Sequence, residues 1–468
     1  MPRVLSRGRW WSADELAAMA RGWHAATLDT LGDRSRLVAA ALPATPEGVA
    51  LFVALSSLQA HLVVLLPDPR AWRTEPPVPA GTPLVLPPSL ASLGPAGRAL
   101  GLVPFVLRDA VASRGIGLPV VPLQGPGVVL FTSGSTGRPK PVFRPTPTLI
   151  TWALGRVGVL GLARGAGTLI GVPLGTGQGL HNLLAALLLD GALGLLEPLD
   201  HRAALEALGS PAFQCWRATP HFADLLGRCP LTGPAVAPRF CLLSSPISRS
   251  VHDAFLARFG VPLRQTYSCT EAGVVTVDAA PSPLVRPETV GCPVNGVEIF
   301  AGDDPGRIGP SGETGRIWVR SPALMAGYGF PPAVESLETV DGWWPTQDVG
   351  VLEADGHLLL AGRLDDCIRT RENRLVSLAA VATRLRDIEG VTEVVVVPLT
   401  GSAGASVGAV IQASPGLSAK TVRVRLAETL PPWCWPRAVE IVPSLPRLPS
   451  GRPDRGACVN LLGGTPPT

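Results

Sequence analysis

The stretch VVLFTSGSTGRPKPVF occupies residues 128–143. An apolar run that ends at Phe131 leads into a segment of Thr, Ser and Gly, and Lys140 follows. This order predicts a buried strand that enters a hydroxyl-rich loop, whose backbone N–H groups and hydroxyls can contact phosphate oxygens. It is not a Walker A loop, because no Gly-Lys-Ser/Thr follows at the required spacing. Taken alone, such a loop is more often a polar turn without a ligand.

The lysine in this stretch is unusual for the chain. Of the 40 Lys and Arg residues, only Lys140 and Lys420 are lysine. An ammonium is a compact point charge on a flexible stem, whereas a guanidinium is a flat fork. A lysine at a position where this chain normally uses arginine therefore favours a single-charge contact with a phosphate oxygen.

The composition limits the class of protein. A chain of 468 residues has room for more than one domain, and 46% apolar residues exclude a disordered chain. A net charge of +4 without any Lys/Arg block predicts no nucleic-acid partner. The eight cysteines form no C-x-x-C pair and no metal-ligand spacing, so they predict buried thiols in a reducing compartment.

Two segments bear on localisation. Residues 1–20 lack the apolar core and small-residue cleavage site of a signal peptide. The most membrane-like run, residues 48–67, contains Gln59 and His61, and predicts a buried helix followed by a strand rather than a span. We therefore expect a cytoplasmic protein that does not insert into a membrane.

Short apolar runs at 62–67, 127–131, 169–174, 213–219, 239–245 and 263–268 alternate with helical patterns. This alternation predicts an α/β fold with largely buried, parallel strands. From about residue 285 the pattern changes to antiparallel hairpins, and the last hundred residues read as a small α+β unit. We expect a large domain over 1–361 with a β-rich part at about 285–361, a hinge over 362–366, and a small domain over 367–468.

Four further stretches carry chemical groups: RQTYSCTEAG (264–273), GWWPTQDVG (342–350), LLLAGRLDDCIR (358–369) and LPRLPSGRPDRGA (445–457). Singly, each has an ordinary structural interpretation. Tyr267 suits a core position, Glu271 a helix-start carboxylate, and Asp348 with Arg363 a surface ion pair. Their order along the chain is what makes them informative.

The phosphate loop, then Tyr-x-x-Thr-Glu, then Thr-x-Asp before Gly-Arg-x-Asp, together resemble the adenylate-forming (ANL) superfamily, which includes acyl-CoA synthetases and other AMP-dependent acid ligases. The resemblance runs from about residue 45 to the end of the chain. It implies an α/β large N-terminal domain of stacked mixed sheets with flanking helices, a β-barrel-like subdomain, and a small mobile α+β C-terminal domain.

The resemblance also implies which residues bind ATP. The expected contacts to the β- and γ-phosphates are Thr132, Ser133, Gly134, Ser135, Thr136, Gly137 and Lys140. The segment expected to line adenine is Ser244, Ser245 and Pro246, where the family usually has glycines.

Further roles follow from the same resemblance. Tyr267 is expected to stack on the base, Thr270 to touch the α-phosphate and Glu271 to hold Mg²⁺. Asp348 is expected to accept hydrogen bonds from the ribose, with Arg363 close by. The expected hinge residue is Asp365.

The implied reaction activates a carboxylic acid as an acyl-adenylate and transfers it to the thiol of CoA or of a carrier-protein phosphopantetheine. Here the chain departs from the family near its C-terminus, where Ser450-Gly451-Arg452 stands in place of a motif ending in lysine. Arginine keeps the charge but changes its shape. Either Arg452 substitutes for the lysine, or adenylation is slow or absent and the protein is a weak nucleotide- and acid-binding homologue.

A second departure lies after the hinge, where Arg371 replaces a glycine that in relatives borders the pantetheine channel. This substitution puts the use of free CoA in doubt and keeps an amine or hydroxyl acceptor open. The arginines Arg369, Arg371 and Arg374 either face an acidic carrier protein or the CoA 3′-phosphate, or form a solvated surface.

The acid itself is only partly constrained. Gly175-Thr176-Gly177 stands where many relatives carry an aromatic residue, and no aspartate is present to pair with an α-amino group, so an amino acid is disfavoured. Thr176, Trp216 and Cys269 are the expected pocket residues, and their apolar surroundings favour an acyl or aryl acid. His181-Asn182 either approaches the pocket or has a capping or core role, and the second role is favoured.

Overall fold

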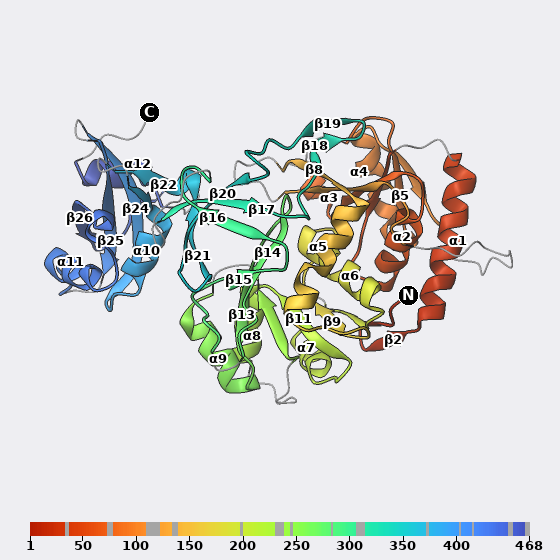
Figure 1. Cartoon of the computed structure of the whole chain (residues 1–468), viewed down its shortest axis with the longest axis horizontal. Coiled ribbons are helices and arrows are strands. Elements are labelled where there is room, and N and C mark those ends of the chain that lie inside the picture. The colour runs from red at the N-terminus through yellow and green to blue at the C-terminus, as the bar shows by residue number, and fades with distance from the viewer. Residues whose placement is uncertain are drawn as a thin grey trace. The chain divides into compact units, whose positions relative to one another are not determined.

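The computed structural model describes residues 1–32, 37–72, 78–108, 122–132, 139–196, 200–229, 238–243, 247–281, 284–305, 314–370, 374–401, 404–413, 416–447 and 453–463. These residues form two compact units. The first comprises Met1–Glu298 and Arg320–Thr339, and the second comprises Ile299–Val319 and Val340–Thr468. Figure 1 labels their helices and strands.

Two large sheets build the first unit. One has nine strands in the order β15 (Cys292–Pro293), β14 (Gly273–Val277), β13 (Leu263–Cys269), β12 (Phe240–Leu243), β11 (Phe213–Ala218), β9 (Gly167–Ile170), β10 (Leu193–Leu195), β1 (Val4–Ser6) and β2 (Arg9–Trp11). The run from β13 to β1 is parallel. The carboxyl ends of parallel strands share one edge of a sheet, which is where open α/β sheets place their ligands.

The other sheet has eight strands in the order β19 (Ala333–Ser336), β18 (Gly327–Phe330), β8 (Pro141–Pro145), β7 (Gly127–Phe131), β4 (His61–Leu65), β3 (Leu37–Ala41), β5 (Pro83–Leu86) and β6 (Val103–Val106). Its strands from β7 to β6 are parallel, whereas β8 and β18 run antiparallel to their neighbours. The strand β7 leads into the hydroxyl-rich loop.

Helices cover these sheets (Figure 1). The described helices of this unit are α1 (Ala13–Leu31), α2 (Pro46–Ser56), α3 (Pro69–Trp72), α4 (Gly94–Ala99), α5 (Thr146–Val159), α6 (Gly177–Leu189), α7 (His201–Leu208), α8 (Pro220–Arg228) and α9 (Arg249–Phe259), with a 3₁₀ turn at Pro88–Leu93. Helix α1 begins with a capping box, in which the Ser12 and Glu15 side chains each accept from the other's backbone N–H.

The core of the first unit has distinct layers. One apolar cluster joins residues of both large sheets through α2, α5 and α6, and α2 is buried over almost its whole length. A second cluster packs α7, α8 and α9 on the other face of β11 and β12. Because side chains alternate along a strand, Cys215 faces the first cluster and Trp216 the second.

Three smaller sheets build the second unit: β16 (Glu298–Ala301), β17 (Gly315–Arg320), β20 (Trp344–Leu352) and β21 (Leu358–Arg363) in that order; β22 (Cys367–Arg369) with β23 (Leu375–Ser377); and β24 (Val391–Gly401), β25 (Gly404–Ala413) and β26 (Ala438–Val442). Its helices are α10 (Leu378–Arg386), α11 (Ala419–Ala427) and α12 (Arg455–Leu461), with 3₁₀ turns at Leu364–Asp366 and Pro432–Cys434. Apolar residues of α10, α11, β24 and β25 form its main core.

The predicted fold class is confirmed. The membrane-like run forms the buried helix α2 followed by the strand β4, and no described helix is long and apolar enough to cross a bilayer. One of the antiparallel hairpins expected after residue 285 joins β20 and β21. All eight cysteines are free thiols, of which three are buried and five are partly exposed, so burial was predicted for too many of them. The hinge over 362–366 stays a prediction.

Candidate functional site

The stem of the hydroxyl-rich loop is held by paired hydrogen bonds. The backbone N–H of Thr132 donates to the Lys140 carbonyl oxygen at 3.1 Å, and the Lys140 N–H donates to the Thr132 hydroxyl at 3.0 Å. These two residues therefore close the base of the loop at the end of β7. The other predicted phosphate contacts, Ser133–Gly137, lie outside the described residues.

Lys140 and Glu271 converge on one aromatic side chain. The ammonium nitrogen of Lys140 lies 5.2 Å from the ring centroid of Tyr328. The Tyr328 hydroxyl donates a hydrogen bond to Glu271 Oε1 at 3.1 Å. Burial and the neighbouring Glu271 carboxylate raise the pKa of Tyr328, so this hydroxyl keeps its proton at neutral pH. Lys140 and Glu271, which are 131 positions apart in the sequence, thus meet at one side chain.

Arg144 holds the backbone on which Thr270 and Glu271 stand. This β8 side chain is fully buried. Its Nη1 donates to the carbonyl oxygens of Thr270 at 2.8 Å and Glu271 at 3.1 Å, and its Nη2 donates to the Ala323 carbonyl. Its guanidinium stacks 4.6 Å from the Trp152 ring centroid. Arg144 thereby fixes the position of the Thr-Glu pair without being one of the groups that point to a ligand.

The remaining residues of this stretch lie along β13. Tyr267 is 6% exposed, and its backbone N–H donates to the Thr276 hydroxyl at 3.3 Å. Cys269 is partly exposed and its sulfur accepts from the Ala272 N–H at 3.3 Å. The adenine segment expected at 244–246 lies outside the described residues.

In the second unit, Asp348 and Arg363 form an ion pair across the β20–β21 ladder. Arg363 Nη1 lies 2.9 Å from Asp348 Oδ1, and the carboxylate is 16% exposed. The Thr346 hydroxyl accepts from the Asp348 N–H at 3.0 Å, which fixes the strand at this point. Asp365 is exposed in the 3₁₀ turn that follows β21.

The arginines after the hinge have partners within the second unit. Arg369 forms an ion pair with Asp303 at 2.6 Å, and the Arg374 guanidinium lies 5.1 Å from the ring centroid of Trp433. Arg371 and Arg452, which carry the two departures from the family pattern, lie outside the described residues.

A small cavity lies in the first unit, and its lining includes Ser268, two residues before Thr270. Helix α6 begins close to Thr270 and to Trp152, which lines the cavity. A Cβ on Gly177, the first residue of α6, would lie 3.3 Å from the Trp152 ring and 3.6 Å from the Thr270 hydroxyl. The lining comes from α5, α6, β11, β13 and β14: Trp152, Arg156, Gln178, His181, Asn182, Arg217, Thr266, Ser268 and Val274. Most of these side chains are polar, and no carboxylate is among them.

The predicted pocket residues occupy other places. Trp216 is fully buried and stacks 5.6 Å from Phe255, on the opposite face of β11 from the cavity, so the neighbouring Arg217 lines the cavity instead. Thr176 caps α6, and its hydroxyl accepts from the Gly179 N–H at 3.1 Å. Neither Thr176 nor Cys269 is among the lining residues. The cavity is therefore more polar than the sequence predicts.

His181 and Asn182 do line the cavity, although the sequence favours a capping or core role. His181 Nε2 lies 3.1 Å from the Trp152 carbonyl oxygen, and its ring stacks on Trp152 at 5.4 Å. Burial first, and then the charges of Arg156 and Arg217, hold the pKa of His181 well below its usual value. The imidazole is therefore neutral at neutral pH.

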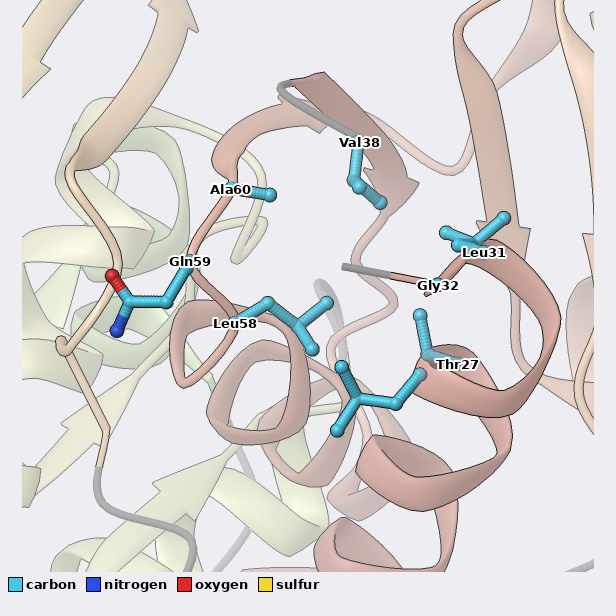
Figure 2. A pocket seen from close by; sticks show the side chains of 8 residues that line it. Thr27, Leu31, Gly32, Val38, Leu58, Gln59 and Ala60 are labelled. Atoms are coloured by element: carbon cyan, nitrogen blue, oxygen red, sulfur yellow. The ribbon is translucent and has the colours of Figure 1, made fainter. Parts of the chain in front are cut away.

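A second hollow, shown in Figure 2, lies at the end of α1 against β3 and the turn before β4. Thr27, Gln59 and apolar side chains line it, and none of them is charged. No predicted site residue lines this hollow, so it is not the candidate functional site.

Comparison with known proteins finds a family match over the part of the chain that contains Lys140, Glu271 and Tyr328. Residues 116–329 match the AMP-binding enzyme family. The chain is similar to the fatty acid–[acyl-carrier-protein] ligase ScoC of Streptomyces coeruleorubidus, at 31% identity over 44% of this chain and 41% of that protein. The chain spans less than half of the length of the first curated relatives that it matches, from 6% to 41%.

Solved structures share the whole fold. The amide bond synthetase McbA from Marinactinospora thermotolerans superposes with a TM-score of 0.76 at 27% identity, covering 98% of this chain and 96% of that one. The ATP-bound MatB from Rhodopseudomonas palustris superposes with a TM-score of 0.75 at 22% identity, covering 98% and 95%.

Four residues of this region were not predicted from the sequence: Tyr328, Arg144, Arg156 and Arg217. Tyr328 is one of only two tyrosines in the chain, and the other is Tyr267. Arg217 stands next to Trp216 inside the apolar run at 213–219, and Arg144 follows Phe143 directly. A charged residue inside an apolar run was a usable signal for burial, but it does not identify the partner.

Proposed function

Because this chain belongs to the adenylate-forming superfamily of AMP-binding enzymes, we propose that it activates a carboxylic acid with ATP and transfers the acyl group to an acceptor thiol. The observation that carries this proposal is the convergence of Lys140 and Glu271 on Tyr328, at the base of the loop that follows β7. A cation and a carboxylate held together at the end of a parallel strand suit a polyphosphate and its metal.

In the first half-reaction, an oxygen of the substrate carboxylate attacks the α-phosphorus of ATP. The bond from the α-phosphorus to the bridging oxygen breaks, and pyrophosphate leaves with its electron pair. Two anions must approach each other, so cations have to offset their repulsion. Lys140 supplies one charge, Arg452 supplies another from the small domain, and the Thr270 hydroxyl contacts the α-phosphate.

Glu271 suits a magnesium site of the kind that nucleotide-binding enzymes use. Mg²⁺ is usually held by one or two carboxylates together with phosphate oxygens and water. Within the described residues no three His, Cys, Asp or Glu side chains gather as a cage, so a single carboxylate fits this pattern. When bound, the ion neutralises phosphate charge, while Tyr328 orients the carboxylate of Glu271.

The rest of the nucleotide site is proposed from the family pattern. The loop Thr132–Gly137 would surround the β- and γ-phosphates, and Ser244, Ser245 and Pro246 would line adenine beside Tyr267. Asp348 would accept hydrogen bonds from the ribose, with Arg363 holding its carboxylate. Rotation of the small domain about Asp365 would then change the enzyme from the conformation for the first half-reaction to that for the second.

In the second half-reaction, the acceptor attacks the acyl carbon and AMP leaves. We propose the phosphopantetheine thiol of a carrier protein, or CoA, as the acceptor, and the similarity to the carrier-protein ligase ScoC supports the carrier protein. An amine acceptor is the second candidate. It is supported by the likeness to the amide bond synthetase McbA over nearly the whole chain, and by the arginine at position 371.

Acid-dependent exchange of labelled pyrophosphate into ATP tests the first half-reaction. Glu271→Gln should lower the exchange rate by roughly 100-fold, since it removes the charge that would hold the metal. Glu298→Gln is the matched control, because Glu298 lies in an exposed ion pair with Arg320 at 3.3 Å. Equal rates for the two variants would contradict the role of Glu271.

Two further comparisons test the departures from the family pattern. If Arg452 replaces the usual lysine, Arg452→Ala should lose exchange while Arg452→Lys retains it. An unchanged rate in both variants would remove Arg452 from the reaction. Transfer to CoA, to a holo carrier protein and to hydroxylamine, measured in the wild type and in Arg371→Gly, distinguishes a thiol acceptor from an amine acceptor.

A further inference from the structure

Two buried positive charges, Arg156 and Arg217, line the cavity near Ser268, and neither has a negative partner among the residues that the structure describes. The exposed fraction is 2% for Arg156 and 3% for Arg217. Among the described residues, Arg156 donates to the Asn182 side-chain oxygen, and Arg217 Nη1 donates to the Thr266 hydroxyl at 2.8 Å. Both of these partners are neutral, and neither arginine forms an ion pair with a described carboxylate.

The same cavity has N–H groups that lack acceptors. The Nε atoms of Arg156 and Arg217 and the indole Nε1 of Trp152 are buried without a hydrogen-bond partner in the described part of the chain. Trp152 is 3% exposed and lines the cavity with the two arginines. Three unpaired donors around one cavity call for an acceptor, since each costs free energy while it remains unsatisfied.

The two guanidiniums also repel each other. Burial first, and then the charge of Arg156, lower the pKa of Arg217 to about 9, which leaves it protonated at neutral pH. Two like charges in a buried site are unfavourable unless an anion compensates them. A cavity with this charge would also reject an ammonium group, which agrees with the expectation that an amino acid is not the substrate.

We propose that this cavity binds a second anionic group of the acid substrate, so that the enzyme activates acids carrying a carboxylate or a sulfonate in addition to the carboxylate that reacts. The inference rests on the proposed adenylation and deepens it. The second anion would accept hydrogen bonds from Arg156 and Arg217, while Trp152, Gln178 and Ser268 border it.

The position of the cavity separates this anion from the reacting one. Ser268 lines the cavity near the end of β13, two residues before Thr270 in the turn that follows this strand, and Gly177 packs against Trp152 and Thr270. The reacting carboxylate must lie at the α-phosphate, on the side of Thr270 and Lys140. A carboxylate held by both arginines would be a poor nucleophile, because its charge would be neutralised by two hydrogen-bonded cations.

The test measures pyrophosphate exchange with aliphatic and aromatic dicarboxylic acids, each against its own monoamide, and with ω-sulfo carboxylic acids. A monoamide keeps the size and the reacting carboxylate but removes the second charge. We expect the preferred dicarboxylic acid to exceed its monoamide by at least tenfold in kcat/KM. Arg156→Gln and Arg217→Gln should each reduce that ratio at least tenfold, while the exposed control Arg164→Gln leaves it unchanged.

A binding measurement keeps the test independent of catalysis. Without ATP, the preferred dicarboxylic acid should raise the Tm of the wild type more than its monoamide does, and this difference should disappear in Arg217→Gln. Exchange restricted to acids with a single charge overturns the inference while leaving adenylation intact. A proportional loss with every acid in the arginine variants also overturns it, because the arginines would then bind the reacting carboxylate. No exchange with any acid contradicts the proposed function instead, and the Tm comparison still decides the inference.

Discussion

Among the described residues of the first unit, four arginines are buried, and they form two contrasting pairs. All four are between 0% and 4% exposed and leave Nε without an acceptor. Arg144 donates to three carbonyl oxygens, and Arg264 donates to two and lies 3.7 Å from the buried carboxylate of Asp278. Arg156 and Arg217 each donate to one neutral side chain and border a cavity. Terminal nitrogens of the first pair, Arg144 and Arg264, are therefore hydrogen-bonded within the protein. The second pair, Arg156 and Arg217, leaves positive charge available to a ligand in the cavity.

The largest expected effect comes from replacing Arg264, which is hydrogen-bonded within the protein and lies beside a buried carboxylate. Arg264→Met should lower the free energy of unfolding by roughly 3–5 kcal/mol, because Asp278 would remain buried without its cation. Denaturant unfolding measures this change. The exposed Arg164→Met is the control and should stay within about 0.5 kcal/mol of the wild type. A loss at Arg264 no larger than that of the control would remove the distinction between the pairs.

Replacing an arginine that borders the cavity should not lower the free energy of unfolding in this way. Arg217→Met removes a buried charge that lacks a counterion, so without ligand the free energy of unfolding should be unchanged or higher by up to about 2 kcal/mol. The same unfolding measurement applies. A loss of 3 kcal/mol or more would mean that Arg217 supports the fold as Arg264 does.

The carboxylate that Arg144 helps to position gives a third test. Tyr328→Phe removes the hydroxyl that donates to Glu271, and a hydrogen bond to a charged group contributes about 1.5–3 kcal/mol. We expect kcat/KM for pyrophosphate exchange to fall by roughly tenfold or more, and the free energy of unfolding to fall by no more than about 3 kcal/mol. Wild-type activity in this variant would show that Glu271 does not depend on Tyr328.

The smallest effect should come from His181. Its pKa lies well below the usual value, so the unfolded chain binds a proton more readily than the folded one below about pH 6.5. The free energy of unfolding should therefore fall as the pH drops below that value, by at most about 1.4 kcal/mol per pH unit. His181→Gln should show a smaller fall between pH 7.5 and 5.5. An identical pH dependence in both proteins would contradict a buried neutral imidazole.

The sequence was most informative where its pattern is local. The apolar runs that became β7, β11, β12 and β13 were predicted as buried strands, and the loop after β7 was recognised from its Ser, Thr and Gly residues. Lys140 was singled out by its place after this loop and by the rarity of lysine in the chain, and its structural neighbour Tyr328 connects it to Glu271. Such strands are identifiable because burial on both faces leaves a continuous apolar run.

The cavity was less predictable because its properties depend on contacts between distant elements. Trp216 and Arg217 are adjacent, so only one of them can face the cavity. Trp216 was expected in the pocket and was one reason to favour an acyl or aryl acid, whereas the structure places it in the core. Arg156 and Arg217 are 61 positions apart, and no local pattern indicates that their charges share one site without a carboxylate.

Transfer of oxygen from the acid to AMP tests the central claim most directly. A dicarboxylic acid labelled with ¹⁸O in both carboxylates would be incubated with ATP, Mg²⁺ and hydroxylamine as the acceptor, and AMP analysed by mass spectrometry. Attack of the carboxylate on the α-phosphorus predicts one ¹⁸O atom in each AMP formed. AMP without label, or label in pyrophosphate or phosphate instead, would contradict activation of the acid as an adenylate.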